Sequence, residues 1–295
     1  MKFERTRVAG FENALHGMRN PLASWKRSDS LFGLSLYDNM PEYEVAFKWV
    51  ESMNPGLDHE TGSFEDLQNE YAEWLREGIL RFDTDSEVTE YAFIGPNDMD
   101  LAMRLCNAGP EHRKFLRQIQ VSVDITAPLY WWKEFDTYKV GTVANSCSTM
   151  HTIHKKEFTL DDFSCEHLGF WDPELPEEEQ PYKDMTIGWS GEEGTYPIDV
   201  LTDVVSALNK CRELYLLNGD KKYWWQLIQL LPSSYNQKRT VTLNYENLRS
   251  MYFQRRNHKL DEWHGFCKFI TAVMPYAKEL IIFTKEDKED SDGTT

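Results

Sequence analysis

A basic and aromatic segment near the C-terminal end of the chain has the residue types best suited to anion binding. The segment NLRSMYFQRRNHKLDEW, residues 247–263, contains three arginines beside two aromatic residues: Arg249, Arg255, Arg256, Tyr252 and Phe253. On a helix, Arg249 and Arg256 fall along related faces, whereas Arg255 and Arg256 diverge by about 100°. A guanidinium donates two parallel hydrogen bonds, which suits a phosphate or the oxygen of a pyrimidine ring. The alternative is a basic helix face that only contacts solvent.

The overall charge makes this segment more informative than it would be in a neutral protein. The 295 residues include 32 Lys and Arg against 49 Asp and Glu, which gives a formal net charge of -17. Such a chain lacks the attraction to phosphates that drives binding to duplex nucleic acid, so we expect no duplex partner. A small anionic ligand is expected only where basic side chains are gathered locally.

A set of histidines and cysteines offers possible metal ligands: Cys147, His151, His154, Cys165 and His167. Structural zinc sites usually contain closely spaced cysteine pairs, and none occurs here. Ordinary polar residues around a turn are therefore the favoured interpretation, and no metal is predicted. The chain also lacks a Gly-rich phosphate loop and a Gly-x-Ser-x-Gly nucleophile elbow. The segment HETGSFED, residues 59–66, is read as a turn and a helix cap.

Three further features of the sequence limit the class of protein to which the chain can belong. No apolar run approaches the roughly 20 residues of a membrane helix, and the first residues are too polar for a secretory signal. The five cysteines are odd in number and lack paired spacing, which indicates reduced thiols and a cytoplasmic location. The acidic tail, residues 286–295, is predicted to be disordered.

The elements that must position these residues follow from hydrophobic periodicity. Apolar residues recur at helical spacing in 65–80, in a helix that ends near Gly109, in 199–219, in 221–231 and within 240–280. Strict alternation in IQVSVDI, residues 119–125, predicts a half-buried strand. Residues 155–198 are rich in Pro, Gly and acidic residues and are predicted to be a loop insertion. The fold class is α+β: one domain over residues 1–285, with a mixed or antiparallel sheet flanked by helices.

Two segments of the chain together resemble the flavin-dependent thymidylate synthases. The first, within residues 99–154, runs from HRKFLRQIQVSVDI through APLYWWKEFDTYK to NSCSTM. The second, within residues 199–280, contains LLPSSYNQKRTVTLNYENLRS, which resembles the family's Leu-Pro turn, strand and Asn-x-Arg-Ser helix. Residues 1–98 match weakly. The resemblance implies the family's fold, and it makes the polar stretch after the two tryptophans a ligand-binding loop.

The resemblance implies a set of flavin contacts in which several of the family's residues are exchanged. The family's Arg-His-Arg signature, which holds the flavin, is replaced here by Thr137, Tyr138 and Lys139. The Tyr138 ring and the single positive charge of Lys139 are therefore expected to hold the flavin. Arg117 stands where the family has a glutamate and is expected to restore positive charge. The implied cofactor-binding residues are His112, Arg117, Thr137, Tyr138, Lys139, Asn247 and Arg249.

The same resemblance implies where the nucleotide binds. Glu134 replaces a glutamine that helps to hold the pyrimidine, and the family's serine falls on Cys147 or, with one inserted residue, on Ser148. Arg256 matches the arginine that lies against the nucleotide base and is the predicted catalytic residue. The implied substrate-binding residues are Glu134, Asn145, Cys147, Ser148, Arg255 and Arg256.

The function implied is one-carbon transfer to C5 of a pyrimidine deoxynucleotide, from dUMP to dTMP or to a modified pyrimidine. FAD would supply hydride, methylenetetrahydrofolate would supply carbon, and NADPH would re-reduce the flavin. Family members are homotetramers with composite sites, which implies a homo-oligomer here. The alternative is a nucleotide-binding or interaction protein on the same fold that has lost the flavin.

Overall fold

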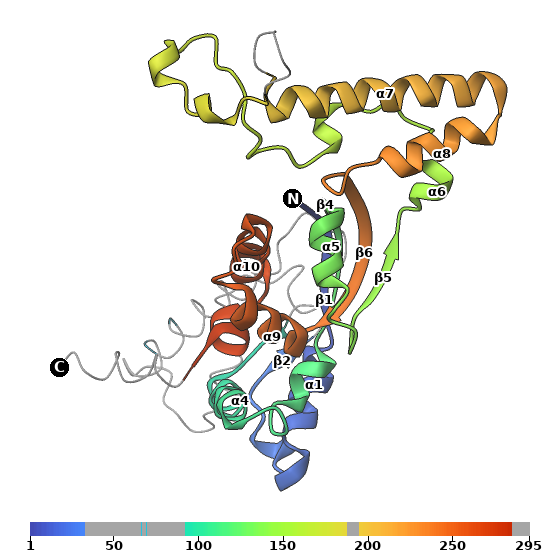
Figure 1. Ribbon diagram of the computed structural model, residues 1–295. Helices are drawn as coiled ribbons and strands as arrows, with labels where there is room; N and C mark the ends of the chain where they lie inside the picture. Colours follow the sequence, from blue (N-terminus) through green and yellow to red (C-terminus); the bar gives the residue numbers. More distant parts are fainter. Residues whose placement is uncertain (33–65, 67–68, 70–91, 188–194, 285–295) are drawn as a thin grey trace. The chain divides into compact units, whose positions relative to one another are not determined.

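The computed structural model describes residues 1–32, 66, 69, 92–187 and 195–284 (Figure 1). Its main feature is a four-stranded antiparallel sheet in the order β1-β4-β6-β5. The strands are β1 (Lys2–Ala9), β4 (Gln120–Pro128), β5 (Val143–Ser146) and β6 (Asn236–Asn244). A short second sheet pairs β2 (Leu31–Phe32) with β3 (Ala92–Phe93) in antiparallel register. Helices flank the main sheet, and the predicted α+β fold is confirmed.

The contacts between residues divide the chain into two compact units made of separate segments. Unit 1 contains Met1–Lys2, Ile125–Thr137 and Asn145–Arg239. Unit 2 contains Phe3–Asp124, Tyr138–Ala144 and Thr240–Thr295. All four strands of the main sheet contribute residues to both units, β1 with Lys2 alone in unit 1. The single domain predicted for residues 1–285 is not tested by this division and stays a prediction.

Among the described residues, unit 2 contains eight of the fifteen helical elements. They are α1 (Phe11–Met18), η1 (Asn20–Leu22), η2 (Trp25–Arg27), α4 (Pro96–Ala108), η3 (Lys114–Gln118), α9 (Tyr245–Arg255), α10 (Asp261–Val273) and the π-helix η7 (Ala277–Ile282). Aromatic side chains join them, because Phe11 of α1 meets Tyr245 and Tyr276 edge to face at 5.6 and 5.9 Å between ring centres. Both tyrosine hydroxyls are bonded inside the fold, Tyr245 to the Pro275 carbonyl and Tyr276 to the Ala92 carbonyl.

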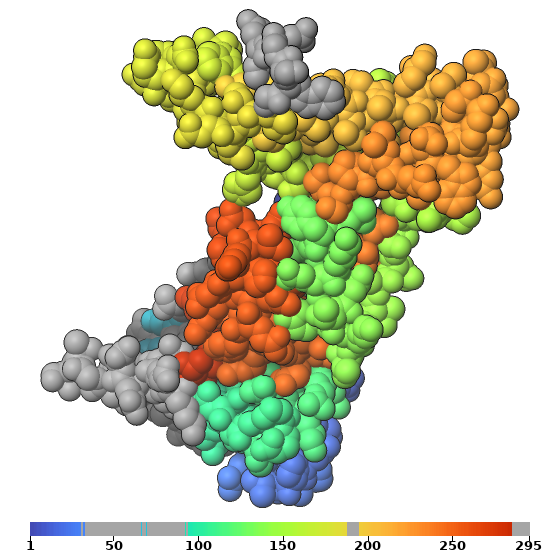
Figure 2. Space-filling model, in the orientation of Figure 1, coloured from blue at the N-terminus to red at the C-terminus, as the bar shows by residue number. Residues whose placement is uncertain are grey.

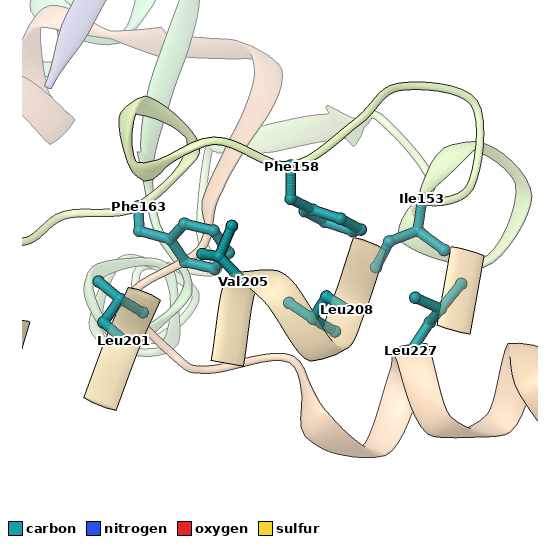
Figure 3. Packing of buried hydrophobic residues seen from close by; sticks show 7 residues of the cluster. All are labelled: Ile153, Phe158, Phe163, Leu201, Val205, Leu208 and Leu227. Carbon is teal, nitrogen blue, oxygen red and sulfur yellow. The ribbon is translucent and has the colours of Figure 1, made fainter. Parts of the chain in front are cut away.

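Unit 1 contains the longest helix of the described residues. Its elements are α5 (Leu129–Phe135), α6 (Thr149–Thr152), η4 (Leu160–Asp162), η5 (Glu177–Glu179), η6 (Lys183–Met185), α7 (Pro197–Asn218) and α8 (Lys221–Leu230). Helices α7 and α8 pack against each other (Figures 1 and 2). Seven buried side chains of unit 1 form one hydrophobic cluster: Ile153, Phe158, Phe163, Leu201, Val205, Leu208 and Leu227 (Figure 3).

Several helices and strands lie at the positions that the hydrophobic periodicity of the sequence predicts. Helix α4 ends at Gly109, whose φ of 129° favours glycine, and α7 ends at Gly219, whose φ is 64°. Strand β4 buries Val121, Val123 and Ile125, as its alternation predicts. The described part of residues 155–198 contains only short 3-10 turns before α7. The helix predicted for 65–80, the turn predicted for 59–66 and the tail from 286 lie outside the described residues, apart from Asp66 and Asn69.

Candidate functional site

Helix α9 carries the predicted anion-binding residues, and its first turn is fixed by two asparagines. The Asn244 side chain accepts a hydrogen bond from the Asn247 amide at 3.0 Å, and the Asn247 side chain accepts one from the Asn244 amide at 3.3 Å. These reciprocal bonds satisfy amides that a helix start leaves without partners. The Asn247 Nδ2 also donates to the Val140 carbonyl at 2.8 Å. Asn247 therefore joins the helix start to the loop that follows Tyr138.

That loop, residues 138–141, is held on α9 at three points. The Tyr138 hydroxyl accepts from Arg255 Nε at 2.8 Å and donates to Gln254 Oε1 at 3.0 Å. Gly141 lies so close to the asparagine pair that a Cβ there would be 2.9 Å from Asn244 Nδ2, and its φ of 79° also favours glycine. The structure thus brings Tyr138 and its loop to Asn247 and Arg255, which lie more than 100 residues later in the sequence.

The two arginines at the end of α9 have different surroundings. The Arg255 guanidinium lies 5.5 Å from the Tyr138 ring and 4.7 Å from the Trp263 ring, so aromatic faces cover it in addition to the bond to the Tyr138 hydroxyl. Arg256 is exposed, and its guanidinium lies 5.2 Å from the Phe253 ring. No carboxylate pairs with Arg256 in the part of the chain that the structure describes. Its hydrogen-bond donors are therefore available to a ligand.

Arg249 is placed differently from the expectation of an open cofactor contact. It is buried, with 6% of its surface exposed, and its two terminal nitrogens donate to the Ile281 carbonyl at 2.6 Å and the Phe283 carbonyl at 2.9 Å. Burial also lowers the pKa of its guanidinium. Both donors bond to carbonyls at or just after the end of the π-helix η7. The resemblance implies that Arg249 binds flavin, but these nitrogens are already bonded within the fold.

The predicted serine position lies in unit 1, at the end of β5. The Cys147 amide donates to the Lys238 carbonyl at 2.9 Å, and its carbonyl accepts from Gln237 Nε2 at 3.0 Å. The Cys147 side chain is exposed and its thiol is free. Ser148 caps the short helix α6, where its hydroxyl accepts from the His151 amide at 3.3 Å. The hydroxyl of Ser148 is thus already engaged locally, whereas the Cys147 thiol faces solvent.

Sequence reasoning missed Gln237, which bonds to Cys147, and Arg239, which in turn bonds to Gln237. Gln237 is buried, and its Oε1 accepts from Arg239 Nε at 2.9 Å. Arg239 also pairs with Asp136 at 2.8 Å and stacks 4.3 Å above the ring of Trp132. The spacing of Gln237 and Arg239 was the available signal, because side chains two residues apart on a strand share a face.

The remaining predicted residues are scattered over the surface. In unit 1, Glu134 is half-buried, Thr137 donates through its hydroxyl to the Glu134 carbonyl at 2.7 Å, and Asn145 is exposed on β5. In unit 2, Lys139 and Arg117 are exposed, and neither cation pairs with a carboxylate within the described ranges. His112 is exposed beside Glu111, with 3.6 Å between His112 Nε2 and Glu111 Oε1.

Neither a metal cluster nor a membrane-spanning helix is found in the described parts of the chain. No group of three or more His, Cys, Asp or Glu side chains lies close enough to hold a metal ion among those residues. Their helices also include none that is long and apolar enough to cross a bilayer.

Comparison with known proteins gives a similarity of fold. No family model and no curated protein matches the sequence. A solved structure of flavin-dependent thymidylate synthase ThyX from Helicobacter pylori, complexed with FAD and dUMP, matches 96% of this chain and 98% of its own, with a TM-score of 0.51 and 13% identity. This similarity confirms the fold that the resemblance implies.

Two further structures match less of the chain. One is ThyX from Helicobacter pylori with FAD and dUMP, with a TM-score of 0.44, 17% identity, and coverage of 64% of this chain and 83% of that chain. The other is the UMP/dUMP methylase PolB from Streptomyces cacaoi bound with 5-Br UMP, with a TM-score of 0.40, 16% identity, and coverage of 62% and 78%. Of these three similarities, the one to the first ThyX structure, with its TM-score of 0.51, indicates a shared fold.

Proposed function

We propose that the chain binds a pyrimidine deoxynucleotide and transfers a one-carbon unit to C5 of its base. The observation that carries this proposal is Arg256, an exposed cation with no acidic partner in the described residues, at the end of a helix whose other arginines are engaged. The fold is shared with a ThyX structure that holds FAD and dUMP, and this similarity supports a nucleotide as the anion.

Arg256 would act on the pyrimidine ring. A guanidinium beside a ring oxygen stabilises negative charge on that oxygen, and this charge makes C5 nucleophilic before C5 attacks a one-carbon electrophile. Glu134, Asn145, Cys147, Ser148 and Arg255 are the further residues that we assign to the substrate. Arg255 would act by holding Tyr138 and the loop after it, because its Nε is already bonded to that hydroxyl.

The residues implied for FAD fit the charge of that cofactor. Lys139 and Arg117 are exposed cations without acidic partners among the described residues, and they would hold its phosphates, with His112 and Thr137 as polar neighbours. The polar groups of Tyr138, Asn247 and Arg249 are used inside the fold, so they would contribute by shaping the loop. FAD supplies hydride when it is bound, with methylenetetrahydrofolate and NADPH as co-substrates.

Binding of dUMP tests the role of Arg256. We expect Arg256→Ala to weaken dUMP binding by about tenfold or more in calorimetry, since a charge-assisted bidentate contact is lost. Arg256→Lys should recover only part of the affinity, because an ammonium lacks the planar fork. Lys259→Ala removes an exposed cation four residues after Arg255 and is the matched control. Equal affinity of Arg256→Ala and the unchanged chain for dUMP would contradict the proposal.

A second candidate function is nucleotide binding without flavin, and the internal bonds of Tyr138, Asn247 and Arg249 favour it. Titration of FAD into the purified chain, followed by flavin fluorescence, separates the two. Saturable binding that Lys139→Ala weakens, with Lys155→Ala as the control on another exposed loop, supports the flavin enzyme. Retained dUMP binding with no FAD binding at millimolar concentration supports the second candidate.

The proposal also includes a homo-oligomer in a reducing compartment such as the cytoplasm. All five cysteines are free thiols, as such a compartment requires. Light scattering on a size-exclusion column measures the oligomeric state, and a monomer at micromolar concentration would remove this part of the proposal.

A further inference from the structure

Residues 168–187 of unit 1 carry exposed acidic and apolar side chains on one short segment. The segment is yellow in Figures 1 and 2 and lies beside the start of α7, where the Ile198 amide donates to the Gly169 carbonyl at 3.2 Å. It contains none of the residues that the proposed function assigns to the nucleotide or to FAD. Its role therefore has to be inferred from its own side chains.

The backbone of this segment is held by a buried amide, although it contains only short 3-10 turns. Gln180 is 6% exposed, and its Oε1 accepts from the Asp172 amide at 2.9 Å. Its Nε2 donates to the Asp172 carbonyl at 2.6 Å and to the Leu175 carbonyl at 2.8 Å. A Cβ at Gly169 would lie 3.2 Å from Tyr182 Cβ, so the segment also folds back closely on itself. A surface fixed in this way loses little conformational entropy when a partner binds.

The apolar side chains of the segment are exposed to solvent. Among the described residues, five of the fifteen exposed large apolar side chains lie here: Phe170, Trp171, Leu175, Met185 and Ile187. The Phe170 ring lies 5.6 Å from the Tyr182 ring between centres. The Trp171 ring lies 6.3 Å from the Tyr196 ring, so each of the two exposed rings has an aromatic neighbour on one side. Exposed apolar side chains that gather among polar ones are typical of a surface that binds another protein.

The charge of the segment favours a basic partner. Between residues 170 and 187 the sequence has six acidic residues and one basic residue, Lys183, which pairs with Glu177 at 3.4 Å. Glu178 and Glu179 are exposed, and neither pairs with a cation within the described ranges. No group of carboxylates there lies close enough together to hold a metal ion. A partner with complementary charge is therefore expected to present basic side chains.

We propose that the surface of residues 168–187 binds a segment of a partner protein in which basic and apolar residues alternate. The basic side chains pair with Glu178 and Glu179, and arginine suits them because a guanidinium donates two parallel hydrogen bonds to a carboxylate. The apolar side chains of the partner cover Phe170 and Trp171. This interaction goes beyond the proposed function, because it uses no residue of the nucleotide or FAD site.

Three fluorescent synthetic peptides of equal length test this chemistry with the full-length chain. The first alternates arginine with leucine, the second alternates arginine with glycine, and the third alternates glutamate with leucine. Fluorescence anisotropy measures the binding of each peptide. We expect the arginine–leucine peptide to bind at least about tenfold more tightly than either of the others, because it alone matches both the charge and the apolar side chains.

A pair of tryptophan variants tests the apolar part of the surface. Trp171→Ala should weaken binding of the arginine–leucine peptide by about tenfold or more, since tryptophans contribute strongly to protein interfaces. Trp225→Ala is the matched control, because Trp225 of α8 has the same exposed fraction of 45%. This control should leave binding unchanged.

Charge reversal tests the acidic part. The double variant Glu178→Lys, Glu179→Lys should weaken binding of the arginine–leucine peptide by about tenfold or more. The double variant Glu12→Lys, Glu213→Lys changes the net charge equally at exposed glutamates of α1 and α7, and it should have a much smaller effect.

Hydrogen exchange provides a test that needs no substitution. The arginine–leucine peptide should slow exchange at the amides of residues 168–187 and leave α8 unchanged. Equal binding of the arginine–glycine peptide, full binding by Trp171→Ala or by the Glu178 and Glu179 reversal, or no binding at millimolar peptide would overturn the proposal. Dissociation of an oligomer by Trp171→Ala, measured by light scattering, would also overturn it, because a second copy of the chain would then cover this surface.

Discussion

The three arginines of α9 share one helix, but their guanidinium groups have different surroundings. Arg249 is buried against two carbonyls, Arg255 lies between two aromatic rings, and Arg256 faces solvent without an acidic partner in the described residues. A buried guanidinium that donates to carbonyls contributes to stability, because its removal leaves those acceptors unsatisfied. An exposed guanidinium contributes little to stability and is free to bind an anion. The helix therefore combines one structural arginine with one that is suited to a ligand.

Replacement of Arg249 should therefore affect the fold more than dUMP binding. We expect Arg249→Ala to lower the free energy of unfolding by about 2–4 kcal/mol, because the Ile281 and Phe283 carbonyls lose charged donors. Urea denaturation followed by circular dichroism measures this change, with Arg256→Ala as the matched control on the same helix. If Arg249→Ala folds as stably as Arg256→Ala and instead loses FAD binding, then Arg249 is the flavin contact that the resemblance implies.

At the scale of elements, Gln237 links β6 to the segment that contains Cys147. Its side chain joins the Arg239 guanidinium to the Cys147 carbonyl, and its own carbonyl accepts from Trp132 Nε1 at 2.9 Å. Strand β6 thus contacts Cys147 through the buried Gln237 side chain, and helix α5 contacts the main-chain carbonyl of Gln237. If Cys147 or Ser148 contacts the nucleotide, Gln237 is a positioning residue for that contact.

Loss of this link should loosen the segment without unfolding the sheet. We expect Gln237→Ala to raise hydrogen exchange by about tenfold at the amides of residues 148–153, because the Cys147 carbonyl loses its side-chain donor. Gln237→Glu keeps an acceptor for Arg239 but loses the donor to Cys147, so it should show the same local increase. Exchange in β4 serves as the internal control. Unchanged exchange at 148–153 in both variants would show that the β5–β6 pairing alone fixes the segment.

The elements also show what the sequence could and could not predict. Local patterns predicted β4 from its alternation and the end of α4 at Gly109, since both depend on neighbouring residues. The contacts of Tyr138 with Gln254 and Arg255 join residues 116 and 117 positions apart, and no local pattern reports them. The acceptors of Arg249 lie in a π-helix, a rare element that hydrophobic periodicity does not identify. The resemblance placed Arg249 correctly in the helix, but only the structure shows which groups surround it.

At the scale of the whole molecule, both units are built from segments that are distant in sequence, and both carry parts of the predicted site. Tyr138, Asn247 and Arg256 belong to unit 2, while Glu134, Cys147 and Ser148 belong to unit 1. The chain as a whole is strongly acidic, with 49 acidic against 32 basic residues. Excess charge of one sign opposes compaction, since every added carboxylate is repelled by the others.

Salt should therefore stabilise the folded chain. We expect the thermal midpoint of unfolding to rise as NaCl increases from about 0.02 M to about 0.3 M, because screening shortens the range of the repulsion. Exposed pairs such as Arg104 with Asp100 are weakened by the same screening, but each contributes at most about 1 kcal/mol. The buried pair of Arg19 and Asp98, which is almost inaccessible to solvent, should change little. Scanning calorimetry measures the midpoint, and KCl at equal ionic strength is the control for specific ion effects. A midpoint that falls with both salts would show that attraction between charges outweighs the repulsion expected from the net charge of -17.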